Sequence, residues 1–183
     1  MDSFPAIEID KVKAWDFRLA NINTSECLNV AYGVDANYLD GVGVSITSIV
    51  LNNRHINLDF YIIADVYNDG FFQKIAKLAE QNQLRITLYR INTDKLQCLP
   101  CTQVWSRAMY FRLFAFQLLG LTLDRLLYLD ADVVCKGDIS QLLHLGLNGA
   151  VAAVVKDVEP MQEKAVSRLS DPELLGQYFN SGV

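Results

Sequence analysis

Two aspartates at the end of an apolar run are the residues of this sequence best suited to chemistry. Asp130 and Asp132 directly follow the run 126–129, with only Ala131 between them. Carboxylate oxygens are the ligands that Mg²⁺ and Mn²⁺ prefer, and an ion held by two of them keeps positions for diphosphate oxygens. Such an ion can stabilise the charge that develops as a diphosphate departs. The pair therefore predicts a divalent metal site for a diphosphate-carrying substrate.

The D-x-D spacing is weak evidence by itself. The sequence contains 15 aspartates, for which chance predicts about one such triplet. The setting is more informative, because two carboxylates at the end of a buried strand repel each other and lose hydration unless a cation is bound. An exposed acidic turn after the strand is the alternative interpretation.

A second apolar run, 28–34, is also followed by polar side chains. Asp35 and Asn37 can form hydrogen bonds with a base or ribose, and the ring of Tyr38 can stack on a base. In the alternative, Asp35 and Asn37 form the turn that begins the next helix, and Tyr38 packs over that turn.

Apolar runs alternate with segments of helical period along the chain, which predicts an α/β fold. Short, mostly apolar strands suit a largely parallel, Rossmann-like sheet with helices on both faces. Ligands bind beyond the carboxyl ends of such strands, so the two polar strand ends should meet. The predicted strands are 28–34, 58–64, 85–91, 126–129 and 150–155. The predicted helices are 42–53 with Asp40 as its cap, 71–79, and 106–119 with Ser106 as its cap and Met109, Leu113, Phe116 and Leu119 as its buried stripe.

The ends of the chain are less regular. Residues 1–27 predict an extension that adds an edge strand or hairpin, because Trp15, Phe17 and Leu19 alternate with polar residues. Residues 28–183 are expected to form one domain, and the segment 178–183 begins a further strand inside which the chain stops.

Composition excludes several classes of function. A net charge of −5 with 16 scattered basic residues argues against nucleic-acid binding. No apolar stretch approaches the roughly 18 residues of a membrane span and no leader is evident, so we expect a cytoplasmic protein. The C-x-x-C at 98–101 lacks two further zinc ligands at suitable spacing, and His55 and His144 leave little room for a histidine-based hydrolase. The pair Gly41 and Gly43 lacks the third glycine of a dinucleotide fingerprint, which weakens an NAD-dependent oxidoreductase.

Taken together, these segments resemble glycosyltransferase family 8, the retaining enzymes of GT-A fold, from Leu28 to Val183. Gly33, Asp35, Asn37 and Tyr38 match the family's uridine-binding strand end, and Asp130 and Asp132 match its metal-binding D-x-D. Arg112 matches an arginine that lies beside the donor, although it could instead be the structural partner of an acidic neighbour. Asp157 and Asn180 match positions that line the sugar pocket, with capping or turn roles as the alternative.

The resemblance extends to the hexosyltransferases of the enterobacterial lipopolysaccharide core. It implies transfer of a hexose with retention, from UDP-glucose to a lipopolysaccharide core sugar in an α-1,2 linkage, with Mg²⁺ or Mn²⁺ as cofactor. An α-1,3-galactosyl- or glucosyltransferase is the neighbouring alternative. These residues identify no catalytic nucleophile.

One departure from the family lies beyond Val183. Family members continue there with a Q-D-Q-D-like segment and a histidine that completes the metal site. We therefore expect a GT-A domain whose C-terminal part is missing. This chain is then expected to be weakly active or inactive. The alternative is a UDP-sugar-binding module without catalysis. Peripheral contact with the inner membrane is expected only of a longer form.

Overall fold

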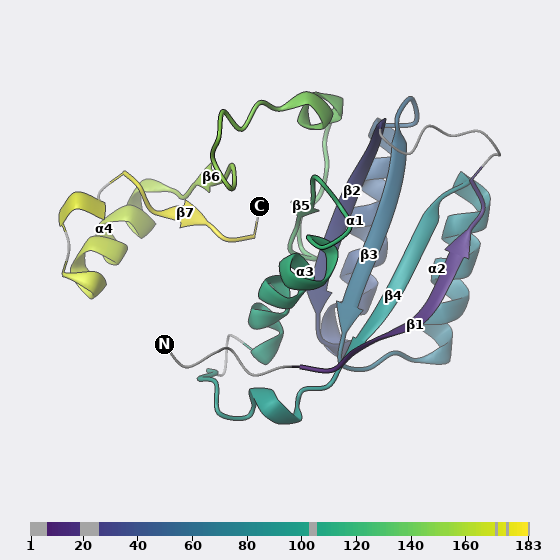
Figure 1. Cartoon of the computed structure of the whole chain (residues 1–183), viewed down its shortest axis with the longest axis horizontal. Helices are drawn as coiled ribbons and strands as arrows, with labels where there is room; N and C mark the ends of the chain where they lie inside the picture. The colour runs from purple at the N-terminus through teal and green to yellow at the C-terminus, as the bar shows by residue number, and fades with distance from the viewer. Residues whose placement is uncertain (1–6, 19–25, 103–105, 171, 175, 183) are drawn as a thin grey trace. The chain divides into compact units, whose positions relative to one another are not determined.

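The computed structural model describes residues 7–18, 26–102, 106–170, 172–174 and 176–182 (Figure 1). The chain divides into two compact units, residues 1–144 and 145–183, which are described separately.

A five-stranded sheet forms the centre of the first unit. Its order is β1-β4-β3-β2-β5, in which β2 to β5 are parallel and β1 runs antiparallel to β4. The arrows of β2, β3 and β4 end at the lower edge of the sheet in Figure 1. The strands are β1 (Ile9–Asp16), β2 (Cys27–Val34), β3 (Asn57–Ala64), β4 (Arg85–Ile91) and β5 (Leu127–Tyr128).

Helices cover both faces of this sheet. Alternate residues of β2 point to opposite sides, so that Val30 and Tyr32 pack in one apolar cluster and Ala31 in the other. Helices α1 (Leu39–Asn52) and α2 (Asp69–Asn82) cover the first face, and α3 (Phe111–Leu119) covers the second (Figure 1). The predicted α/β sheet with helices on both faces is thus confirmed. The 3-10 helices of this unit are η2 (Ala36–Tyr38), η3 (Asp94–Leu96), η4 (Arg107–Tyr110) and η5 (Ser140–His144).

The start of α1 differs from the prediction. Asp40 is not its cap, because η2 turns the chain earlier and the helix already begins at Leu39. Asp40 lies in the first turn instead, where its carboxylate pairs with Lys74 at 2.8 Å. Ser106, by contrast, caps η4 by accepting a hydrogen bond from the Ala108 N–H.

The buried stripe predicted for α3 is wrong at three of its four positions. Met109, Leu113 and Phe116 are 40–47% exposed, and only Leu119 is buried. The chain is a 3-10 helix up to Tyr110, so a stripe of period 3.6 drawn through Met109 is out of phase with the α-helix that follows. The residues that α3 buries against the sheet are Phe111, Phe114, Ala115 and Leu119.

The second unit is a small antiparallel ribbon with one helix. Strand β6 (Val155–Lys156) pairs with β7 (Phe179–Asn180), and α4 (Glu159–Leu169) and η6 (Pro172–Leu174) lie between them in sequence. The predicted strand 150–155 is therefore wrong except at its last residue. Its apolar residues are exposed, Val151 fully. Burial and pairing stabilise a strand, and before Val155 this run has neither.

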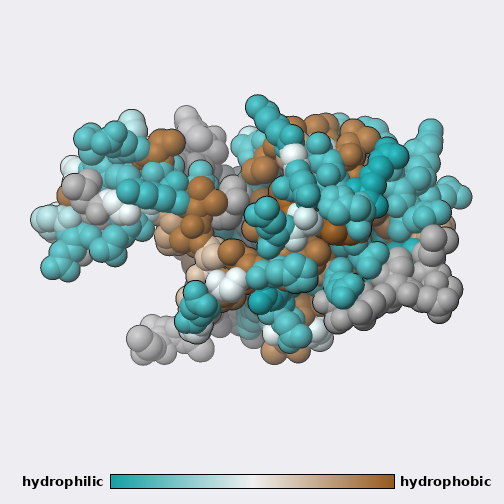
Figure 2. Space-filling model, turned by 90° about the horizontal axis from the view of Figure 1, so that it is seen from above, coloured by the Kyte–Doolittle hydropathy of each residue, from teal (hydrophilic) through white to brown (hydrophobic). Residues whose placement is uncertain are grey.

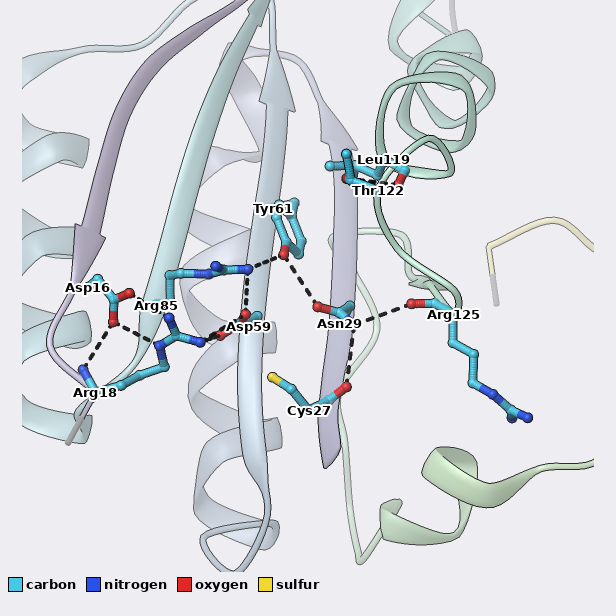
Figure 3. Close-up of polar contacts among 10 residues, drawn as sticks. All are labelled: Asp16, Arg18, Cys27, Asn29, Asp59, Tyr61, Arg85, Leu119, Thr122 and Arg125. Carbon is cyan, nitrogen blue, oxygen red and sulfur yellow. Dashed lines mark hydrogen bonds and ion pairs between the residues drawn. The ribbon is translucent and has the colours of Figure 1, made fainter. Parts of the chain in front are cut away.

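Buried charges connect β1 to the rest of the sheet near the amino ends of β3 and β4. Asp59, whose side chain is only 3% exposed, contacts Arg18 just after β1 at 3.2 Å and Arg85 of β4 at 2.6 Å. Arg18 also contacts Asp16 at 2.5 Å, so four charged groups form one network (Figure 3). This network holds the end of the edge strand against β3 and β4.

The surface is mixed in character. Figure 2 shows hydrophobic residues reaching the surface among a largely hydrophilic covering. Within the described residues, no helix combines the length and the apolar character that crossing a bilayer requires.

Candidate functional site

The two polar strand ends predicted from the sequence leave the same edge of the sheet. Strand β5 pairs directly with β2 through Val30–Leu127 and Ala31–Tyr128. The pairing continues to Leu129, whose N–H donates to the Ala31 carbonyl oxygen at 3.0 Å. Asp130 therefore emerges beside the last residues of β2, as expected for parallel neighbours.

Arg112 is the partner of Asp130. Its Nη2 donates to both carboxylate oxygens, at 3.0 Å to Oδ1 and 3.3 Å to Oδ2, while its Nε donates to the Met109 carbonyl oxygen. The guanidinium also lies 5.1 Å from the centre of the Tyr128 ring. Arg112 is thus the structural partner of an acidic neighbour, as the alternative interpretation held. That neighbour is the predicted metal ligand Asp130, and Arg112 fixes its orientation.

Neighbouring groups shift the pKa of Asp130 in opposite directions. Burial raises the pKa of Asp130, the nearby Arg112 lowers it, and the negative charge of Asp132 raises it further. Asp132 is exposed, and within the described residues no group of three histidine, cysteine or acidic side chains is arranged to hold a metal. Two carboxylates, one half-buried and one exposed, fit a divalent ion that keeps open positions for a ligand.

Two glycines allow the backbone to pack closely around this site. A Cβ on Gly33 would lie 2.7 Å from the Phe111 Cβ, so the first residue of α3 packs directly on β2 and places Arg112 beside Asp130. A Cβ on Gly41 would lie 3.0 Å from the Ala131 carbonyl oxygen, so the first turn of α1 contacts the D-x-D backbone. Sequence reasoning had discounted Gly41 as part of an incomplete nucleotide fingerprint.

Asp35 connects β2 to the segment before α3. Its Oδ1 accepts a hydrogen bond from the Asn37 N–H at 3.0 Å, which forms the turn of η2. Its Oδ2 accepts one from the Ser106 hydroxyl at 2.7 Å. Asp35 therefore has the turn role that was the alternative, while Tyr38 is 55% exposed, with its ring accessible.

Asp157 and Asn180 belong to the second unit, which the structure describes by itself. Asp157 Oδ1 accepts a hydrogen bond from the Val158 N–H just before α4, and Asn180 Oδ1 accepts one from the Gly182 N–H in a turn. Asn180 thus has the turn role that was the alternative, whereas Asp157 does not cap α4, whose N-cap is Val158 without a side-chain hydrogen bond. The structure brings these two residues to one ribbon, where Val155 pairs with Asn180, and their place in the site remains a prediction.

The segment after the D-x-D is held by α1 and its C-cap. Asn53 is fully buried, and its Oδ1 accepts a hydrogen bond from the Ile139 N–H at 2.8 Å. Its Nδ2 donates to the carbonyl oxygens of Ile49 at 2.9 Å and Gly137 at 3.3 Å. Ser48 Oγ accepts from the Cys135 N–H at 2.9 Å. Apart from the contact with Ile49, these contacts join residues more than 80 positions apart, so no local sequence signal reveals them.

Replacing Asn53 with alanine should lower the free energy of unfolding by about 2 kcal/mol, because the Gly137 carbonyl oxygen and the Ile139 N–H would lose a fully buried partner. Urea denaturation followed by circular dichroism measures the effect. The matched control is Asn52→Ala, since Asn52 contacts the Cys135 carbonyl oxygen from an exposed position where water can replace it. Equal stability of the two variants would contradict this role for Asn53.

Comparison with known proteins identifies the family. The model of glycosyl transferase family 8 matches residues 29–183, which is most of the chain. The chain belongs to glycosyltransferase family 8. Strand β1 lies before the residues matched by the family model.

Relatives in this family include enzymes of lipopolysaccharide synthesis. The chain is 40% identical over 97% of its length to the lipopolysaccharide 1,2-glucosyltransferase of Escherichia coli. It is 38% identical over 91% of its length to the lipopolysaccharide 1,3-galactosyltransferase of Salmonella typhimurium. It covers 50% of each relative, so the chain spans about half the length of these glycosyltransferases.

Solved structures support the predicted GT-A fold. The galactosyltransferase LgtC, solved in complex with donor and acceptor sugar analogs, superposes with a TM-score of 0.71. The match covers 85% of this chain and 56% of LgtC at 20% sequence identity, so it bears on the fold alone.

Proposed function

We propose that this family 8 chain binds a UDP-hexose through a divalent metal and forms the donor-binding part of a retaining lipopolysaccharide hexosyltransferase. The observation that carries the proposal is the contact of Arg112 with both oxygens of Asp130, beside Asp132 at the end of β5. Parallel strands place this group next to Asp35, Asn37 and Tyr38 at the end of β2. A diphosphate at the first group and a nucleoside at the second would span one edge of the sheet.

Asp130 and Asp132 would hold Mg²⁺ or Mn²⁺, which when bound stabilises the negative charge of the departing UDP. Arg112 keeps Asp130 in one orientation and opposes the rise in its pKa that burial causes, which favours the ionised carboxylate that a metal ligand requires. The exposed ring of Tyr38 is available to stack on the base, and Asn37 offers an amide beside it.

The names of the relatives support a hexose donor and a lipopolysaccharide core acceptor. Glucose from UDP-glucose, in an α-1,2 linkage, is our first choice because the 40% identical relative is a 1,2-glucosyltransferase. Galactose in an α-1,3 linkage is the alternative, supported by a relative at 38% identity. Asp157 and Asn180 are proposed to face the sugar. We propose a cytoplasmic reaction, with contact at the cytoplasmic face of the inner membrane only in a longer form.

A nucleotide panel tests the proposal. Isothermal titration of UDP, GDP and NAD into the chain with Mn²⁺ present should show binding of UDP at least about tenfold tighter than of the other two. Such a ratio corresponds to about 1.4 kcal/mol. Tighter binding of NAD than of UDP would overturn the proposal in favour of an oxidoreductase.

A further inference from the structure

A pocket of about 420 Å³ opens at the carboxyl ends of β2 and β3. Asp35 and Asp65 both line it, each directly after the register pair Val34–Ala64 of these parallel strands. Two aspartates therefore lie at neighbouring strand ends. The other lining residues used below are Ser106, Arg107 and Phe111.

The two carboxylates differ in their partners. Both oxygens of Asp35 accept hydrogen bonds, from the Asn37 N–H and from the Ser106 hydroxyl. Asp65 Oδ1 is inaccessible to solvent and has no hydrogen-bond partner among the described residues. This oxygen of Asp65 thus lacks a hydrogen-bond donor, whereas both oxygens of Asp35 have one. A buried polar atom without a partner is unusual.

Two of the donors that line the pocket, Ser106 and Arg107, are engaged elsewhere. The Ser106 hydroxyl donates to Asp35, and the Arg107 guanidinium donates to the carbonyl oxygens of Leu96 and Gln97. Burial raises the pKa of Asp65, hydrogen bonds from the backbone of Asp65 and Val66 oppose this rise, and the negative charge of Asp35 adds to it. A buried carboxylate oxygen without a partner is costly, and a ligand that donates an N–H or O–H to the Asp65 carboxyl group would offset that cost.

We infer that Asp65 is a recognition residue of the donor pocket, whose carboxyl group accepts a hydrogen bond from the nucleoside of the nucleotide sugar. The inference rests on the proposed function, because the nucleoside must enter the pocket beyond β2 and β3. Two groups of uridine can supply the hydrogen: the imide N3–H of the base and the hydroxyls of the ribose. Cytosine carries an acceptor in place of the imide N–H, so a contact with the base would also select uracil over cytosine.

Titrations of wild type and Asp65→Ala, with Mn²⁺ present, test the inference. Three ligands are needed: UDP, N3-methyl-UDP without the imide hydrogen, and 2′,3′-dideoxy-UDP without the ribose hydroxyls. Asp65→Ala should weaken UDP binding about tenfold to a hundredfold, the usual value of a hydrogen bond to a charged group. The loss should vanish with the one analogue that lacks the hydrogen in contact with Asp65, which identifies the base or the ribose as its source. An unchanged affinity for UDP would overturn the inference, and so would an equal loss with all three ligands.

Thermal unfolding without nucleotide separates recognition from a structural role. Asp65→Ala should not lower the unfolding midpoint, because it removes a carboxylate with an unsatisfied oxygen. Asp69→Asn, an exposed aspartate after the same strand, is the matched control for charge and should leave UDP binding unchanged. A fall in the midpoint on Asp65→Ala together with weaker binding of every ligand would assign Asp65 a structural role. If wild type itself fails to bind UDP, the proposed function fails; if only Asp65→Ala is without effect, the inference alone fails.

Discussion

Asp132→Ala should abolish the metal-dependent part of UDP binding and leave the fold intact. Asp132 is exposed, so its removal disturbs no packing, yet it supplies one of only two carboxylates at the end of β5. Loss of a direct metal ligand should weaken metal-dependent binding by at least about 100-fold, the upper range for residues that only support ligands. Isothermal titration of UDP in Mn²⁺, with circular dichroism as the check on folding, measures both parts of the expectation.

The control for this experiment is Asp138→Ala. Asp138 is another exposed aspartate of the same segment, and it pairs with His55 at 3.5 Å rather than with the D-x-D. Asp132 is a cleaner target than Asp130, because removing Asp130 would also leave Arg112 without its carboxylate partner. Metal-dependent UDP binding that survives Asp132→Ala, with an affinity like that of Asp138→Ala, would show that the D-x-D is an ordinary acidic turn.

Asp59→Asn should lower the free energy of unfolding by about 3 kcal/mol, because it removes the charge that Arg18 and Arg85 share. The side chain of Asp59 is almost completely buried, so water cannot replace it. Urea denaturation at neutral pH, followed by circular dichroism, measures the loss. The matched control is Asp16→Asn, since Asp16 contacts Arg18 from a side chain that is 47% exposed. We expect that variant to lose less than about 1 kcal/mol, as for a surface ion pair.

Equal stabilities of these two variants would contradict the role of Asp59. The buried network is significant because β1 covers the outer edge of β4, and an uncovered strand edge invites pairing with other chains. Since Arg18 follows β1 directly, a weaker Asp59 network should first release this strand. We therefore expect the amino ends of the strands to contribute to stability and their carboxyl ends to bind the ligand.

The central strands were predictable because burial on both faces leaves a continuous apolar signature. The runs 28–34, 58–64 and 85–91 agree with β2, β3 and β4 to within one residue. The run 150–155 has the same composition, yet only Val155 is in a strand. Apolar composition permits a strand, but strand pairing and burial by other elements decide whether it forms. The local sequence determines neither of them.

The buried face of α3 was not predictable for a different reason. Phe111, Leu113, Phe114 and Phe116 are all apolar, so two different stripes fit the same segment. Both stripes lie within α3, and its packing against the sheet decides that Phe111 and Phe114 are buried while Leu113 and Phe116 are exposed.

The candidate site was predictable where strand order alone determines it. Asp35 and Asp130 each follow an apolar run, and the parallel pairing of β2 with β5 brings those ends together. Arg112 and Asp130 are 18 residues apart, and the sequence left open which acidic group the arginine contacts. Asp65 gave the same signal as Asp35, an aspartate after an apolar strand, and was overlooked. The contacts of Ser106 and Asn53 depend on segments about 70 to 90 residues away, which only the folded chain reveals.

The most direct test of the central claim is the metal dependence of UDP binding by the wild-type chain. UDP is titrated calorimetrically into the protein with Mn²⁺, then after EDTA, and again after Mn²⁺ is restored. We predict binding in the first and third titrations and a loss in the second, because Asp130 and Asp132 are proposed to contact the diphosphate only through the ion. Binding of UDP with the same affinity in EDTA would contradict this prediction.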